Sequence, residues 1–246
     1  PTDDVVSGTD PAGTGLNVGE TACCLAMESE RIVWSEDGDL WLWEPSSGEK
    51  TRIVDADGDQ RDPALSGERL VWADNRDGDY DIWMMDLTTG VEAALVQAAG
   101  DQDWPTLDGD YLAWVDRRVF PHGNREADIW LMELSDPTMA RALVADNAQQ
   151  DHPHLRGQRV VWDDFSADPD GVYRDFADPQ ENNGDIIGYD IDTDTVFMVT
   201  NDGSKQLRPA IDGEHVVWLD WRGISPEPKY SEFQVYTRRV GPELVL

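Results

Sequence analysis

The stretch from Gln60 to Leu87, QRDPALSGERLVWADNRDGDYDIWMMDL, decides the fold of this chain, because its pattern recurs along the sequence. A proline stands nine residues before a tryptophan, and an acidic residue follows two positions after the tryptophan. The proline and tryptophan pairs are Pro63 and Trp72, Pro105 and Trp114, Pro153 and Trp162, and Pro209 and Trp218, after a degenerate copy with Leu25 and Trp34. The tryptophans are 38, 42, 48 and 56 residues apart. Five copies at such spacings indicate a repeat architecture.

Each copy has the composition of short β-strands. The runs 70–73, 82–87 and 91–96 are apolar or β-branched, turn residues separate them, and no 3.6-residue apolar period occurs. The proline fits a strand start because it has no N–H to donate. Four strands per copy of about 40 residues are typical of a β-propeller blade. We therefore predict an all-β fold, a single five-bladed β-propeller of four-stranded antiparallel blades over residues 21–246.

The copies resemble the TolB-like, or WD40-like (PD40-type), propeller repeat. In that family a proline leads a Ser-Pro-Asp-Gly turn, which precedes an apolar strand and a strand of Ile-Tyr type. This chain departs from the pattern with Leu65-Ser66-Gly67 and Leu107-Asp108-Gly109 at the turn, and with tryptophan where the family often has phenylalanine. The resemblance covers residues 21–246 and implies the fold. It leaves the function open, because such propellers serve both as binding platforms and as enzymes.

Residues 1–20 have the Gly, Thr, Asp and Pro composition of a flexible linker. We expect them to be the remnant of export processing, which predicts a periplasmic or extracellular protein. A cloning artefact and an edge strand at Val5-Val6 are the alternatives. No run of 18 apolar residues is present, so we expect no transmembrane segment.

The chain carries 51 acidic and 19 basic residues, for a formal net charge of −32. Such a field repels nucleic acid and anionic lipid and attracts divalent cations and basic partners. We expect a monomeric propeller without a nucleic-acid partner. Adaptation of the surface to salt is an equal alternative to specific cation binding.

The insertions predict which face of the propeller is functional. The turns between strands one and two and between strands three and four are short, whereas the loops between strands two and three carry VDRRVFPHGNREAD and DDFSADPDGVYRDFADPQENNG. In an antiparallel blade those loops share one face with the entries into the inner strands. Long loops are often functional. We predict that this elaborated face binds a protein or glycan partner.

The inner strands carry polar residues at equivalent positions near the same face. Glutamine stands three positions before each proline, and strand alternation places it on one side with the residues just before and just after the proline. We predict that this side lines the central channel and that the glutamines either tie neighbouring blades or bind a ligand. The predicted binding residues are Gln60, Asp62, Gln102, Asp103, Trp104, Gln150, His152, Gln206 and Arg208, with Arg76, Arg118 and Arg222 on the rim.

The rim arginines belong to a repeated Asp-x-Arg pattern, Asp74 with Arg76, Asp116 with Arg118 and Asp220 with Arg222. Because alternation puts each aspartate and its arginine on one face, we predict salt bridges between blades, each worth less than about 1 kcal/mol on an exposed rim.

Two residues give a metal alternative. His152 and His154 alternate on one predicted strand, a spacing that suits a transition metal, and Asp62 or Cys24 from other blades would complete the set. Histidines and a glutamine on one inner strand also resemble the metal site of propeller-type oligogalacturonate lyases. Packing or hydrogen-bonding histidines are the favoured interpretation. Adjacent Cys23 and Cys24 are expected to be free and buried, because a bond between neighbours is strained.

Calcium is the other metal that the sequence suggests. The oxygen clusters are Asp55, Asp57 and Asp59, and the aspartates of the blade-four insertion, which include Asp168 and Asp170. We predict that any bound Ca²⁺ is structural. We also predict that the insertion, residues 164–185, folds over the elaborated face, because its acidic groups need a cation beside them and its aromatics favour order.

The sequence thus favours an exported, non-enzymatic binding module, with calcium as the more plausible metal. No Gly-x-Ser-x-Gly, nucleotide loop or paired zinc motif occurs. The alternative is a metal-dependent, lyase-like carbohydrate-active enzyme that uses His152 and His154 in the channel.

Overall fold

The computed structural model describes residues 18–19, 21–118, 127–144, 148–166, 184–201, 203–221 and 233–241. Within them the chain forms five antiparallel sheets, one for each sequence repeat. The described part contains no helix long and apolar enough to cross a membrane. Residues 242–246 and nearly all of the predicted linker lie outside these residues.

The five sheets follow the chain in order. Blade one has β1 (Cys23–Glu28), β2 (Arg31–Glu36), β3 (Asp39–Glu44) and β4 (Glu49–Val54). Blade two has β5 (Gln60–Ser66), β6 (Arg69–Asp74), β7 (Asp81–Asp86) and β8 (Val91–Val96). Blade three has β9 (Gln102–Asp108), β10 (Tyr111–Asp116), β11 (Asp128–Glu133), the 3-10 helix η1 (Pro137–Met139) and β12 (Arg141–Ala142). Blade four has β13 (Gln150–Arg156), β14 (Arg159–Asp164), β15 (Asp185–Asp190) and β16 (Thr195–Met198). Blade five has β17 (Gln206–Asp212), β18 (His215–Asp220) and β19 (Gln234–Arg239).

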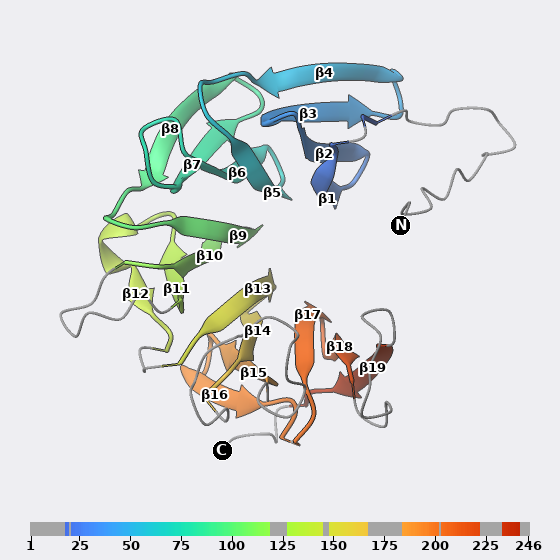
Figure 1. Cartoon of the computed structure of the whole chain (residues 1–246), viewed down its shortest axis with the longest axis vertical. Helices are drawn as coiled ribbons and strands as arrows, with labels where there is room; N and C mark the ends of the chain where they lie inside the picture. The colour runs from blue at the N-terminus through green and yellow to red at the C-terminus, as the bar shows by residue number, and fades with distance from the viewer. Residues whose placement is uncertain are drawn as a thin grey trace, which may run out of the picture.

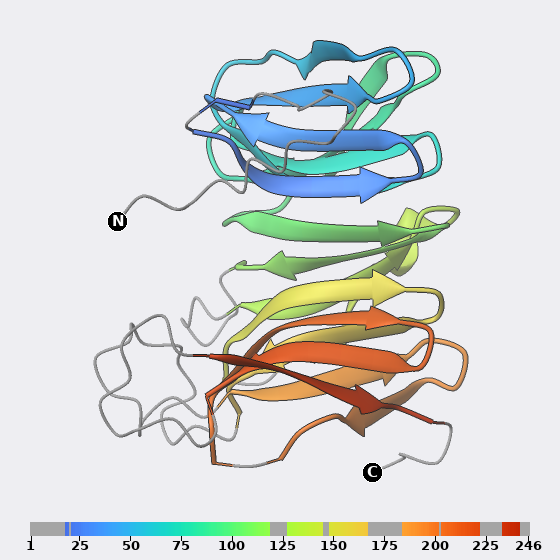
Figure 2. The same ribbon diagram turned by 90° about the vertical axis from the view of Figure 1, so that its right-hand side faces the viewer.

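The sheets are arranged as propeller blades, which confirms the predicted fold class. The first strand of each sheet lies at the centre, and the later strands lie progressively outward (Figure 1). The strands of successive sheets run across the molecule in similar directions, so that the turns gather on two opposite sides (Figure 2). The central strands β1, β5, β9, β13 and β17 therefore surround a channel.

The core consists of four interfaces between consecutive blades. Each interface joins two kinds of surface, which blade two illustrates. Its tryptophan face, with Leu70 and Trp72, packs on blade one, and its leading face, with Val71, Ala73 and Ile82, packs on blade three. The same two surfaces recur from blade to blade along the chain. The apolar residue two positions after the proline lies in these interfaces, as Leu107, Leu155 and Ile211 show.

A hydrogen bond inside each blade explains the repeated tryptophan and acidic residue. The indole Nε1 of Trp72 donates to the carboxylate of Asp74 at 2.8 Å, and both residues are almost completely buried. A buried indole N–H needs such an acceptor. The equivalent bonds are Trp34 to Glu36, Trp114 to Asp116, Trp162 to Asp164 and Trp218 to Asp220, at 2.8 to 3.2 Å.

The blades form an open arc. Each central strand contacts the next from β1 to β17, but β1 and β17 are not among the closely contacting pairs, and Figure 1 shows an opening between blade one and the β17–β19 sheet. Within the described ranges no backbone hydrogen bond joins these two blades. The predicted five-bladed propeller implies that blade five packs on blade one and closes the ring. The structure does not show this closure.

Candidate functional site

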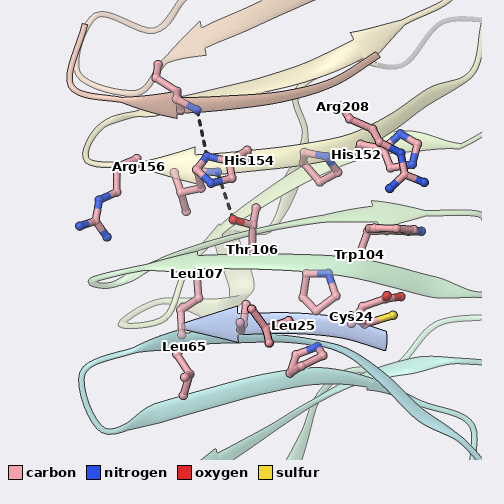
Figure 3. A pocket seen from close by; sticks show the side chains of 18 of the residues that line it. Cys24, Leu25, Leu65, Trp104, Thr106, Leu107, His152, His154, Arg156 and Arg208 are labelled. Atoms are coloured by element: carbon pink, nitrogen blue, oxygen red, sulfur yellow. Dashed lines mark hydrogen bonds between the residues drawn. The ribbon is translucent and has the colours of Figure 1, made fainter. Parts of the chain in front are cut away.

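The channel holds a cavity of about 610 Å³ lined by the central strands of all five blades (Figure 3). Its wall consists of the prolines, with Leu25 in blade one, and the side chains around them. Its volume is within the range of small-molecule sites in proteins, roughly 300–1,000 Å³. We take this cavity as the candidate site.

A backbone irregularity decides which side chains enter the cavity. The residue just before the proline, or before Leu25 in blade one, has a left-handed backbone in all five blades. Its φ lies between 49° and 54°, and the strand pairing shifts register there. These residues are Cys24, Asp62, Trp104, His152 and Arg208. A non-glycine residue in this conformation costs roughly 1–3 kcal/mol, so the surrounding strands must hold it. The extra residue reverses the side-chain alternation on its N-terminal side.

Because of this bulge, the predicted position of the glutamines in the channel is wrong. Gln60, Gln102, Gln150 and Gln206 have no exposed surface, and none lines the cavity. The Gln102 amide bonds instead to the loop that leads into its own strand: Nε2 donates to the Gly100 carbonyl at 2.6 Å, and the Ala98 N–H donates to Oε1 at 3.0 Å. Gln60 binds the carbonyls of Ala56 and Asp57 in the same way. These glutamines fasten the connections between blades, which was one of the two predicted roles.

The residues just before the prolines line the cavity as predicted. At one end Trp104, His152 and Arg208 come together from β9, β13 and β17 (Figure 3). The ring centroids of Trp104 and His152 are 4.7 Å apart in an edge-on arrangement, and the Arg208 guanidinium carbon is 5.8 Å from the Trp104 ring. Three blades thus build one cluster with an aromatic surface and two nitrogen-bearing groups.

Asp163 on β14 holds this cluster in place. Its Oδ2 is 2.8 Å from Nδ1 of His152, and its Oδ1 accepts the Arg208 backbone N–H at 3.2 Å. Burial by itself lowers the pKa of His152, but the charge and hydrogen bond of Asp163 outweigh it, so that the pKa lies above its ordinary value. Sequence reasoning missed Asp163. The available signal was a carboxylate immediately after the blade's tryptophan, where the other blades have Ser35, Ala73, Val115 and Leu219.

Cys24 and Asp62 supply the polar groups of blades one and two. Asp62 is largely buried, and burial raises the pKa of its carboxyl group. Burial also raises the pKa of the Cys24 thiol, which the nearby Cys23 and Asp62 increase further. Cys23 and Cys24 are both free, as predicted, although Cys23 is exposed rather than buried.

Salt bridges between blades occur on other residues than those predicted. Arg61 of β5 binds Asp103 of β9 at 3.1 Å, and Arg117, just after β10, binds Asp151 of β13 at 2.7 Å. Burial raises the pKa of Asp103 to about 6 although two guanidinium groups lie nearby. Asp103 therefore belongs to the contact between blades and does not line the cavity.

The predicted rim pairs are formed within single blades. Arg76 binds Asp74 and Glu92, all in blade two, and its guanidinium carbon lies 3.9 Å from the centroid of the Trp83 ring. Arg118 repeats the arrangement with Asp116 and Trp130. The prediction of salt bridges between blades was wrong for these residues, because the aspartate also caps the turn of its own chain after the second strand. Arg222 lies outside the described residues.

The two candidate histidines both line the cavity but have separate partners. His154 accepts the backbone N–H of Ile211 through Nδ1, whereas Nδ1 of His152 faces Asp163. In the described part of the chain no group of three or more His, Cys, Asp or Glu residues is placed to hold a metal ion, and this includes Asp55, Asp57 and Asp59. Asp168, Asp170 and most of the predicted loop at 164–185 lie outside the described residues.

Fold and cavity define a β-propeller with a cavity in its central channel. Solved structures place it among TolB-like propellers in fold. TolB of Agrobacterium tumefaciens superposes with a TM-score of 0.64 at 14% identity, over 85% of this chain and 73% of that one. The tricorn protease gives 0.62 at 13% identity over 90% of this chain but 22% of its own. A nidogen/laminin complex gives 0.58 at 15% identity, with 82% and 72% covered. No family model matches the chain, and no curated protein matches it significantly. At these identities the likeness shows the fold alone.

Proposed function

We propose that the protein is an exported, non-enzymatic binding module that holds its partner at the end of the channel formed by Trp104, His152 and Arg208. A protein or a glycan contacting the surrounding face is the expected partner, and bound calcium, if present, is structural. Two of the similar propellers come from proteins whose names differ in function, a TolB and a protease, so the fold leaves the choice open.

One observation carries the proposal. Where the fold needs a residue, the blades repeat it: the tryptophan occurs five times and the glutamine four times. Just before the proline the backbone is the same in all blades, yet the side chains are five different ones, Cys24, Asp62, Trp104, His152 and Arg208. The shared backbone does not require this diversity. A ligand that makes a different contact with each blade would account for it.

The cavity lacks the parts of a nucleophilic enzyme within the described residues. The Cys24 thiol has a raised pKa, and a thiol in that state is a poor nucleophile. One nitrogen of His152 contacts Asp163, and among the described residues no hydroxyl or thiol forms a hydrogen bond with this ring. This arrangement suits recognition better than covalent catalysis.

A metal-dependent lyase is the second candidate, because His152 and His154 line the same cavity. Elemental analysis of the dialysed protein separates the two functions. We expect less than one equivalent of transition metal per chain. A stoichiometric metal that is lost in His152→Ala would favour the lyase.

The binding role is tested with panels of immobilised glycans and peptides probed with the wild type, Trp104→Ala and Met139→Ala. Met139 is exposed on η1 and serves as the control because it does not line the cavity. We expect binding that Trp104→Ala abolishes and Met139→Ala preserves. Equal binding by both variants would place the partner elsewhere. Fractionation of the producing cells tests the export.

A further inference from the structure

The Arg208 guanidinium differs from those of the other described arginines in its partners. In a chain with a net charge of −32, eleven of the thirteen arginines in the described ranges form ion pairs with carboxylates. Arg238 has no carboxylate but donates to the Val199 carbonyl. Among these residues, only the Arg208 guanidinium has neither a carboxylate nor a hydrogen-bond acceptor. A free cation amid so many acids is available to a ligand.

The neighbours of Arg208 complete a site. Its guanidinium lies beside Trp104 and His152 at one end of the cavity (Figure 3). Because Nδ1 of His152 is held by Asp163, Nε2 is the nitrogen that remains for another partner. When the ring is protonated, Nε2 becomes a second donor. The Trp104 ring offers a flat apolar surface next to these two donors.

The buried Asp163 shows that this arrangement is built rather than incidental. Its side chain has no exposed surface, and a buried carboxylate is costly unless it is hydrogen-bonded or paired. The corresponding positions in other blades include Ala73 and Val115, which pack without that cost. Asp163 fixes both the His152 ring and the backbone of Arg208. It is therefore a positioning residue for the two donors.

We propose that this end of the channel binds a small organic anion, in which one carboxylate is attached to a ring. The Arg208 guanidinium and Nε2 of His152 take the carboxylate, and the ring lies against Trp104. Arg–carboxylate pairs are planar and frequently two-pronged, which suits a single carboxylate held at the edge of an aromatic surface. The inference rests on the proposed function and names the ligand class of that site.

The rest of the molecule limits the ligand to one or few charges. The field of a −32 chain opposes polyanions, and Asp62, Asp151 and Asp163 lie around the same end of the cavity. A monocarboxylate with a ring fits a cavity of about 610 Å³. Two sources share this chemistry, aromatic acids and single sugar acids.

Isothermal titration calorimetry at about pH 6, where His152 is protonated, tests the proposal with benzoate and glucuronate. Benzyl alcohol and glucose are the matched neutral probes. We expect at least one acid to bind and its neutral counterpart to bind at least about tenfold more weakly. The acid that binds identifies the source. Arg208→Gln should weaken that acid by about tenfold or more, whereas Arg238→Gln should leave it unchanged.

The positioning role of Asp163 has a separate readout. In Asp163→Asn the affinity for the acid should no longer rise as the pH falls from about 8 to about 6, because the imidazole loses the charge that raises its pKa. The proposal is overturned if neither acid binds, if the neutral probe binds equally well, or if Arg208→Gln has no effect. Equal binding of glucose, lost in Trp104→Ala, would overturn the anion site while leaving the binding module intact.

Discussion

The side chains just before the inner-strand prolines show how a repeated backbone supports a unique site. Because of their left-handed backbone, the glutamine two residues earlier points into the protein, whereas the side chain before the proline lines the channel. The glutamine then satisfies buried backbone groups that would otherwise have no partner. The position before the proline is free to differ from blade to blade, and it does.

The opposite surroundings of His152 and His154 give opposite pH effects on stability. The pKa of His152 is raised, so its contribution is present below pH 6.5 and is lost as the pH rises through the folded-state pKa. Burial lowers the pKa of His154, so the wild type loses stability as the pH falls from 6.5 through that lower value. Urea unfolding of His152→Gln and His154→Gln across this range should show stability differences from wild type with opposite slopes. Parallel slopes would contradict the assigned surroundings.

Substitution of Gln102 distinguishes a structural role of the glutamines from a ligand-binding role. Gln102→Ala leaves the Ala98 N–H and the Gly100 carbonyl without their partner and should lower the free energy of unfolding by about 2–3 kcal/mol. Ligand binding at the channel should be unchanged. Thr106→Val, in the cavity wall of the same strand, is a comparison that replaces only one hydroxyl, the acceptor of the Leu155 N–H. A loss of binding in Gln102→Ala without a loss of stability would restore the ligand-binding role.

At the scale of the element, the repeat predicts the strands well and their faces less well. Trp72 lies within β6 and Asp74 ends it, because turns and apolar runs are local signals. The proline was predicted at a strand start, but Pro63 lies inside β5, at the bulge between Arg61 and Ala64. The prediction of which side chains face the channel fails at Asp62. A bulge adds one residue there, and a strict in-and-out alternation of side chains does not take it into account. The Asp74–Arg76 pair fails for a related reason: the chain leaves the strand there, and the arginine turns back on its own blade.

The two end blades expose surfaces that are buried elsewhere. Val235 is 70% exposed, whereas Ile82, Ile129 and Ile186 at the same position of other blades are 0% exposed. Val217 is 40% exposed, and its equivalents are fully buried. On the other side of the opening, Met27 is 68% exposed. The leading face of blade five and part of the tryptophan face of blade one thus remain uncovered in the arc.

This difference predicts unequal effects of one substitution at equivalent positions. Ile82→Asp buries an unpaired charge and should destabilise the protein by more than about 4 kcal/mol. Val235→Asp should change stability by no more than about 0.5 kcal/mol. Thermal and urea unfolding of the two variants provide the measurement. If Val235→Asp is as damaging as Ile82→Asp, the ring is closed in solution.

For the whole molecule, the charge of −32 makes stability depend on ionic strength. Screening should raise the melting temperature as NaCl increases from about 0.05 to about 0.5 M, because the Debye length falls below the spacing of many surface charges. CaCl₂ and MgCl₂ at equal ionic strength test for a calcium site. A calcium site predicts a larger increase with CaCl₂ than with MgCl₂, and equal increases would leave charge screening as the whole effect.

The sequence predicts the number of blades but not how they are placed around the axis. Five tryptophan copies give five sheets, because each copy holds its own strands and turns. Closure depends on whether blade five meets blade one, and no local pattern encodes the rotation from blade to blade. The site, too, could be predicted only in part. Trp104, His152 and Arg208 were predicted, but Asp163, which orients two of them, lies on another strand and became evident only from contacts.

An open arc has a first and a last blade, and this determines where local unfolding begins. In the part of the chain that the structure describes, blades two, three and four pack against a blade on both sides, whereas blades one and five each pack against one blade. In arrays with nearest-neighbour contacts, local unfolding starts at the ends. Amide hydrogen exchange should therefore be fastest in β1 and in β18–β19 and slowest in β9 and β10. Because β17 carries Arg208, fraying of the last blade would release a ligand held there without unfolding the rest.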